Sequence, residues 1–96
     1  MAAVRRGETR LATALLAVAA GVEPSAVEHA ASLRSGKGLV SLVWKAHFTM
    51  RLAAPLQTLL ARLAPEAVLR ALPGGDFPLS TDEMRWQIEF LSQASR

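Results

Sequence analysis

Apolar residues recur at helical spacing along most of the chain and predict a series of short helices. Between Thr9 and Ala20 one helical face is apolar, and Gly21 is placed to end this helix in the left-handed conformation. A second helix is expected to begin at Pro24, because proline at a first helical position removes no helical hydrogen bond, and to end near Arg34. The apolar faces of these two helices are Leu11, Ala14, Leu15 and Val18 in the first, and Ala26, Val27, Ala30, Ala31 and Leu33 in the second.

Two further helices are predicted in the middle of the chain. The segment from Ser35 to Gly38 is expected to be a turn, and a short third helix follows it. Thr49 is the expected cap of a fourth helix, in which Pro55 either kinks the helix or marks its start, since a proline ring removes one backbone hydrogen bond. The apolar stripes are Leu39, Leu42, Val43 and Ala46, widened by Val40 and Trp44, in the third helix, and Leu52, Leu56, Leu59 and Leu63 in the fourth.

The last third of the chain is predicted to contain one brief helix, a loop and one longer helix. Pro65 is expected to open the brief helix, which runs through Ala71. The segment from 72 to 78, Leu-Pro-Gly-Gly-Asp-Phe-Pro, contains too many helix breakers to be anything other than a loop. The sequence Ser80-Thr81-Asp82-Glu83 is a capping box that predicts the start of the final helix, which runs to about Gln93.

These elements predict an all-α fold of five to six short helices in hairpins, arranged as an irregular bundle or a HEAT-like stack. A length of 96 residues allows a single α-helical domain, 1–96. Hydrophobic residues make up 51% of the chain and aromatic residues only 5%, so the core must consist of leucine and alanine, which are strong helix formers. The absence of cysteine excludes disulfides and thiolate metal sites and is compatible with a reducing compartment, so we expect a cytoplasmic protein.

The charges are spread over the whole chain. The formal net charge is +3, but eight acidic residues are interleaved with the eleven lysines and arginines, a balance typical of a solvated surface. The longest apolar run, from Leu11 to Val22, is too short to cross a membrane, and we expect no membrane contact. This run follows Arg10 and could also be a secretory leader, but its amphipathic order and the nearby Glu8 favour a helix of the folded domain.

The final helix is the most informative element, because it is apolar on two sides. Met84, Ile88 and Leu91 form one stripe, whereas Trp86 and Phe90 lie on nearly the opposite face. A terminal helix of a small domain usually lies at the surface, so one stripe can pack on the core while the other binds a partner or a second copy. Aromatic residues and arginine are enriched in interface hot spots, which makes Arg85, Trp86 and Phe90 the candidate partner-binding residues. The alternative is that the preceding loop, with Phe77, folds back over the aromatic pair.

Several segments together resemble the C-terminal part of a family of uncharacterised bacterial proteins, domain of unknown function 2336. These segments are Arg6-Gly7-Glu8, Ala20-Gly21-Val22 with Pro24, Gly38-Leu39, Trp44-Lys45-Ala46, Thr49-Met50-Arg51, Leu56-Gln57, Asp76-Phe77-Pro78-Leu79-Ser80, Glu83-Met84-Arg85-Trp86-Gln87 and Phe90-Leu91. The resemblance runs from about Arg6 to Ser92, and its most specific element is the closing Pro-Leu-Ser-x-x-Glu-Met-x-Trp-Gln segment. It implies a C-terminal module of a longer protein with HEAT-like hairpins, and it implies no activity. His47 stands where the family is expected to have glycine, and Pro55 where a small or branched apolar residue is expected.

A DNA-binding helix-turn-helix is the alternative function. Apolar residues from Leu39 to Leu56 can be aligned with that motif, and the pI of about 10.6 favours it. Against it, the second helix would contain Pro55 and would offer only Arg51 for reading bases.

The sequence contains no pattern of catalytic residues. His29 and His47 are the only histidines, and neither lies at ligand spacing from another histidine or from cysteine. The segment Gly36-Lys37-Gly38 is too short for a phosphate-binding loop and follows no strand. We therefore expect a non-enzymatic protein without cofactor or metal, whose function is to bind another protein.

Overall fold

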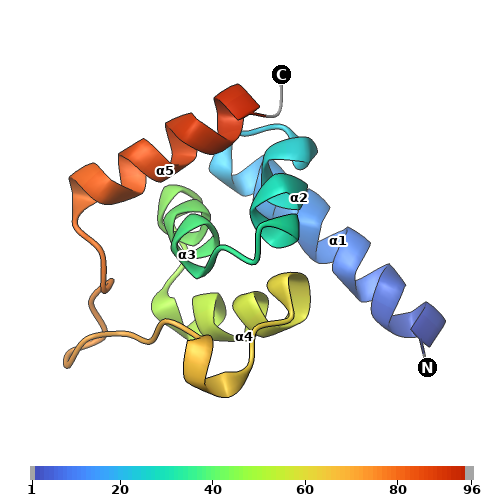
Figure 1. Ribbon diagram of the computed structural model, residues 1–96, viewed down its shortest axis with the longest axis horizontal. Helices are drawn as coiled ribbons and strands as arrows, with labels where there is room; N and C mark the ends of the chain where they lie inside the picture. The colour runs from blue at the N-terminus through green and yellow to red at the C-terminus, as the bar shows by residue number, and fades with distance from the viewer. Residues whose placement is uncertain (1, 95–96) are drawn as a thin grey trace.

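The computed structural model describes residues 2–94, and this part of the chain is all-α, as predicted (Figure 1). Five α-helices and one short 3₁₀ helix follow one another within the described residues, and no strand occurs among them. Their bounds are α1 (Ala2–Ala20), α2 (Pro24–Ser32), α3 (Gly36–Lys45), α4 (Met50–Ala61), η1 (Pro65–Ala67) and α5 (Thr81–Ala94).

Helix α3 lies at the centre of the molecule. It contacts α1, α2, α4 and α5, and every residue from Gly38 to Val43 is buried. In Figure 1, α5 passes above α3, α4 lies below it, and α1 and α2 lie to one side. In a linear stack each helical pair contacts only its neighbours. The arrangement around α3 is therefore that of an irregular bundle, the first of the two predicted architectures.

The segment from Ser35 to Gly38 is not a separate turn, as the sequence predicted, but the start of α3. Ser35 is the N-cap, and its hydroxyl accepts a hydrogen bond of 2.9 Å from the backbone N–H of Gly38. A Cβ atom at Gly38 would lie 3.2 Å from Leu91 and 3.3 Å from Ala30. The glycine is therefore needed for close packing of α2, α3 and α5, and this is why a glycine-rich segment occurs inside a helix.

Helix α1 packs with a different face from the one the sequence pattern indicated. Leu16, Ala17 and Ala20 are buried, whereas Leu11 and Val18 are 61% and 81% exposed. Small residues at a contact allow helices to approach closely, and the distance between helix axes depends on the side chains between them. The two buried alanines therefore favour this face over the one with larger side chains. The predicted apolar stripe, which also includes Ala14 and Leu15, lies on the outside.

Helix α4 begins at Met50 and continues through Pro55, so the proline does not mark the start of the helix. Thr49 is at the N-cap position, but its side chain makes no capping hydrogen bond. The buried face is rotated from the predicted leucine stripe, since Leu52 is 40% exposed. The buried residues of α4 are Met50, Ala53, Leu56, Gln57, Leu60 and Ala61.

The segment after α4 is held to the bundle by a buried glutamine rather than by the predicted fifth helix. Only Pro65–Ala67 forms a 3₁₀ turn, and Val68 after it has an extended backbone. The side chain of Gln57 is fully buried, and its amide pairs with the backbone of Leu69: Nε2 donates to the carbonyl at 2.9 Å and Oε1 accepts from the N–H at 2.8 Å. These two bonds take the place of the helical hydrogen bonds that the prediction assumed.

Three of the helices are followed by a residue that has the left-handed backbone conformation and is not glycine. Gly21 ends α1 as predicted, with a φ angle of 72°. The corresponding residues after α2, α3 and α4 are Arg34, His47 and Arg62, with φ angles of 52°, 64° and 54°. The resemblance led us to expect glycine where His47 stands, and the backbone there has the conformation that favours glycine.

Candidate interaction surface

Helix α5 has one face in the core and one face in solvent. Its N-terminus has the serine half of the predicted capping box, because the backbone N–H of Glu83 donates to the hydroxyl of Ser80 at 3.1 Å. Met84 and Leu91 are buried and Ile88 is partly buried against the core. On the other side of the helix, Trp86 is 57% exposed and Phe90 is 41% exposed. The two apolar faces predicted from the sequence are both present.

The exposed aromatic side chains of α5 form an ordered pair. The rings of Trp86 and Phe90 stack with their centroids 5.5 Å apart and an angle of 9° between their planes. This arrangement follows from their spacing, because residues four apart are neighbours on a helix surface. His29 from α2 also lies near Phe90, at a centroid distance of 6.2 Å and an angle of 46° between the ring planes. The contribution of His29 could not be predicted from the sequence, because it depends on the packing of α2 against α5.

The loop that precedes α5 leaves the aromatic pair uncovered. Phe77 is partly buried and packs against the core. Trp86 and Phe90 keep the exposed fractions given above although this loop is in place. Arg85, the third predicted partner-binding residue, is also exposed. We call the exposed side of α5, formed by Asp82, Arg85, Trp86, Glu89 and Phe90, the α5 outer face.

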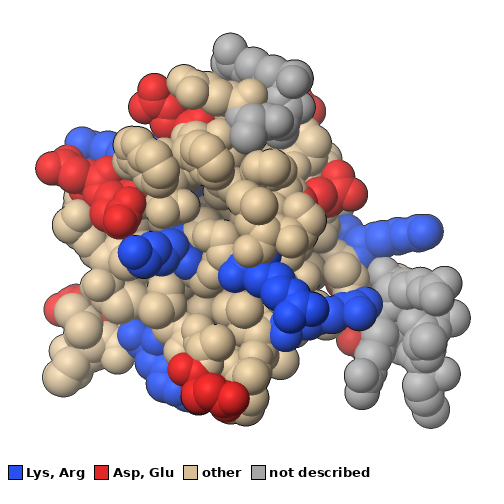
Figure 2. Space-filling view, in the orientation of Figure 1, with Lys and Arg blue, Asp and Glu red and all other residues tan. Residues whose placement is uncertain are grey.

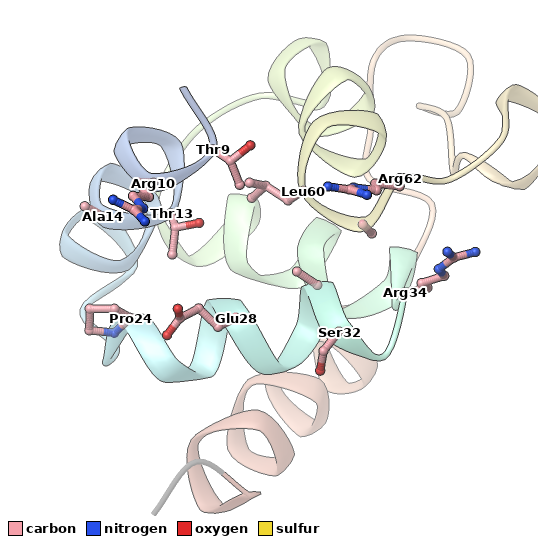
Figure 3. A pocket seen from close by; sticks show the side chains of 12 residues that line it. Thr9, Arg10, Thr13, Ala14, Pro24, Glu28, Ser32, Arg34, Leu60 and Arg62 are labelled. Atoms are coloured by element: carbon pink, nitrogen blue, oxygen red, sulfur yellow. The ribbon is translucent and has the colours of Figure 1, made fainter. Parts of the chain in front are cut away.

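A second surface, which sequence reasoning missed, is a groove of about 530 Å³ between α1, α2 and the end of α4 (Figure 3). Ala14 and Thr13 form part of its wall on α1, and Ala31 and Leu60 contribute apolar surface from α2 and α4. The remaining lining residues are Thr9, Arg10, Pro24, Glu28, Ser32, Arg34, Ala61 and Arg62. Because these residues come from three helices, only the packing of the bundle brings them together.

Three arginines surround this groove. In Figure 3, Arg62 extends from the end of α4 towards Leu60 and Thr9, whereas Arg34 points outwards from the rim. Arg10 lies on the α1 wall, and Glu28 is the one acidic residue that lines the groove. On the face shown in Figure 2, lysine and arginine side chains lie mainly across the middle, and acidic side chains lie mainly towards the edges.

The segment that could be aligned with a helix-turn-helix forms α3 and α4. The middle of helix α3, from Gly38 to Val43, is buried on all sides. The exposed side of α4 offers Arg51, Leu52, Pro55 and Thr58. Of these, Arg51 is the one suited to bidentate contacts with guanine. DNA binding stays an untested alternative.

The histidines lie apart in the structure. His29 lies on α2, where it is partly buried beside Phe90 of α5. His47 is exposed and follows the end of α3. Within residues 2–94, no three histidine, cysteine or acidic side chains come together in a group that could hold a metal ion. In the same range, no helix has both the length and the apolar character that a membrane crossing requires.

Comparison with protein-family models, with curated proteins and with solved structures finds no match for this chain. The resemblance to domain of unknown function 2336 therefore remains a prediction from the quoted segments, and the function has to be inferred from the surfaces described above.

Proposed function

We propose that this chain is a non-catalytic α-helical module that binds another protein chain through the α5 outer face. The observation that carries the proposal is the stacked and exposed pair of Trp86 and Phe90. Contiguous exposed apolar patches on small proteins mark interaction sites. The pair projects from a helix whose opposite face is fixed in the core by Met84 and Leu91. The aromatic rings are thus held in place before a partner arrives, which reduces the entropy lost on binding.

The exposed area of Trp86 and Phe90 is large enough to contribute to the free energy of binding. Fully burying an aromatic side chain removes about 150–250 Å² from water. At their exposed fractions, full burial of Trp86 and Phe90 by a partner would remove roughly 200 Å² of apolar surface from water. This area corresponds to a binding free energy of about 5 kcal/mol at 25 cal/mol per Å². Association itself costs about 4–15 kcal/mol, so the pair would supply the centre of an interface and would need surrounding contacts.

The first experiment is a measurement of molar mass by light scattering on Trp86→Glu and wild type, over a hundredfold range of concentration. A charge in place of the indole should abolish association while the helical content stays constant. The matched control is Leu52→Glu, which places the same charge at an exposed apolar site on α4, on the other side of α3 (Figure 1). This control should associate like the wild type.

If the wild type is a monomer over the whole range, the partner must be a different protein. A photo-crosslinking amino acid at position 86, compared with one at position 52, then tests the proposal in cells that produce the chain. An adduct formed from position 86 and not from position 52 supports the proposal. A monomer that forms no adduct from either position would refute it.

The setting that we propose for this function comes from the resemblance. It suggests a bacterial protein and a module that follows HEAT-like hairpins in longer chains, so the α5 outer face would also be available to such hairpins. The compartment we propose is the cytoplasm, because a sequence without cysteine is compatible with a reducing environment.

A further inference from the structure

The groove between α1, α2 and α4 is complementary in character to the α5 outer face. Its α1 wall continues into solvent as an apolar surface, because Leu11 and Val18 lie three residues before and four residues after Ala14 on the same side of the helix. Together with Ala31 and Leu60, these residues offer an apolar surface that could receive two aromatic rings. Among the residues that the structure describes, no such cover lies over the aromatic pair of α5.

The charges of the two surfaces are opposite. The groove is lined by three arginines and one glutamate, a net charge of +2. The α5 outer face contains Asp82 and Glu89 against the single Arg85, a net charge of −1. Asp82 lies four residues before Trp86, and Glu89 lies three residues after it, so both carboxylates accompany the aromatic pair on the exposed side. Opposite charges around an apolar centre speed encounter and fix the register of an interface.

The two surfaces cannot meet within one molecule. Helix α2 lies between them, since it contacts α1 and α4 on the groove side and α5 on the other (Figure 3). We propose that the partner of the α5 outer face is the groove of a second copy of this chain. This inference rests on the proposed function and names its partner. Each copy would insert its α5 outer face into the groove of a second copy and bind the α5 of a copy in its own groove. The two surfaces in contact are different, so the contact is head to tail.

A contact of this kind should be weak. Helix α5 has 14 residues and is about 21 Å long, so one α5 in one groove buries less than the ~1,200 Å² of a stable complex. Head-to-tail contacts close into rings or continue as chains, depending on the rotation between copies. The average mass should therefore rise with concentration in the micromolar range, starting from the 10.3 kDa of the monomer.

The experiment uses two variants that each lose one half of the contact. Trp86→Glu removes the α5 half and keeps the groove. The second variant combines Arg10→Glu with Arg62→Glu, which reverses the charge of the groove and keeps α5. All three side chains are exposed, so both variants should fold, as circular dichroism will check. Val18→Glu, at an 81% exposed site beside the groove, replaces the double variant if that one loses helix.

The inference predicts that each variant alone is a monomer and that an equimolar mixture forms a one-to-one dimer that grows no further. In that mixture the intact α5 of the arginine variant occupies the intact groove of Trp86→Glu. The matched control for charge is Lys45→Glu combined with Arg51→Glu, two exposed sites outside the groove, which should associate like the wild type. Its midpoint concentration should stay within threefold of the wild-type value, whereas that of each half-variant should rise at least tenfold.

Two results would overturn the inference, and each leaves the proposed function distinguishable. If the arginine variant associates like the wild type while Trp86→Glu is a monomer, α5 binds a second α5 symmetrically, and only the groove assignment is wrong. If the wild type is a monomer at every concentration, self-association is wrong, and crosslinking from position 86 decides whether the α5 outer face binds a different protein.

Discussion

Replacing Gln57 by alanine should lower the free energy of unfolding by about 3 to 4 kcal/mol, and the prediction follows from three hydrogen bonds. The side-chain amide donates to the carbonyl of Leu69 at 2.9 Å and to that of Ala53 at 3.2 Å, and it accepts from the N–H of Leu69 at 2.8 Å. In the variant, the polar groups of Leu69 lose their partners in a partly buried site. Each bond contributes about 1 kcal/mol net, and the space left by the side chain adds about 1 kcal/mol.

Chemical unfolding in urea, followed by circular dichroism, measures this loss against a total stability of about 5–15 kcal/mol. Gln93→Ala is the matched control, because it makes the same exchange on a helix where the side chain is exposed and makes one long contact of 3.4 Å with Glu89. The control should change stability by less than about 0.5 kcal/mol. A loss below about 1 kcal/mol for Gln57→Ala would show that Leu69 is not held by this side chain.

A substitution at Gly36 tests the position of the Gln57 side chain independently. A Cβ atom at Gly36 would lie 2.8 Å from Oε1 of Gln57, so Gly36→Ala should displace the amide from Leu69. In the Gln57→Ala background that conflict is absent. The two losses should therefore be less than additive, and strict additivity would contradict the contact.

Three further predictions address the helix ends, the orientation of α1 and the DNA-binding alternative. His47→Gly should raise stability by up to about 1 kcal/mol in urea unfolding, because the φ angle of 64° disfavours a side chain; a loss would show that the imidazole makes a stabilising contact. Leu16→Ala should cost about 2–5 kcal/mol and the adjacent Leu15→Ala less than about 0.5 kcal/mol, since they are 1% and 58% exposed, and the reverse order would mean that α1 packs with the face first predicted. Retention on immobilised duplex DNA should be negligible at physiological salt; retention that falls steeply with salt and is lost in Arg51→Ala would instead support DNA binding.

The order of the helices could be predicted from the sequence because their ends carry local signals. Pro24 is compatible with a first helical turn, Gly21 with a left-handed end, and Ser80 with an N-cap, and the structure has all three at those places. These signals depend on residues a few positions apart, so no knowledge of the tertiary structure is needed. For the same reason the two apolar faces of α5 could be predicted from periodicity alone, whereas the exposure of Trp86 depends on where the loop with Phe77 packs.

The remaining features depend on contacts between distant segments. The side of α1 that packs inwards could not be chosen, because nine of the ten residues from 11 to 20 are alanine, leucine or valine, the exception being Thr13. Every face is therefore apolar, and periodicity favours the one with the larger side chains. The glycines at 36 and 38 have the composition of a turn, and only the closeness of Gln57 and Leu91 explains their place in a helix. The groove had no local signal at all, since its arginines are separated by 24 and 28 residues along the chain.

The burial of the middle of α3, from Gly38 to Val43, explains why large apolar residues of the surrounding helices remain at the surface. Four helices surround α3, and each can turn only one face towards it. The contact faces of α1 and α2 use alanine, which permits close approach, so the larger apolar side chains are placed outwards. An exposed side chain adds little to the stability of the monomer. Large apolar residues on the outside of α1 and α5 therefore do not stabilise an isolated chain. Their presence is explained if these outer surfaces are covered in an assembly. The residues concerned are Leu11, Leu15, Val18, Trp86 and Phe90.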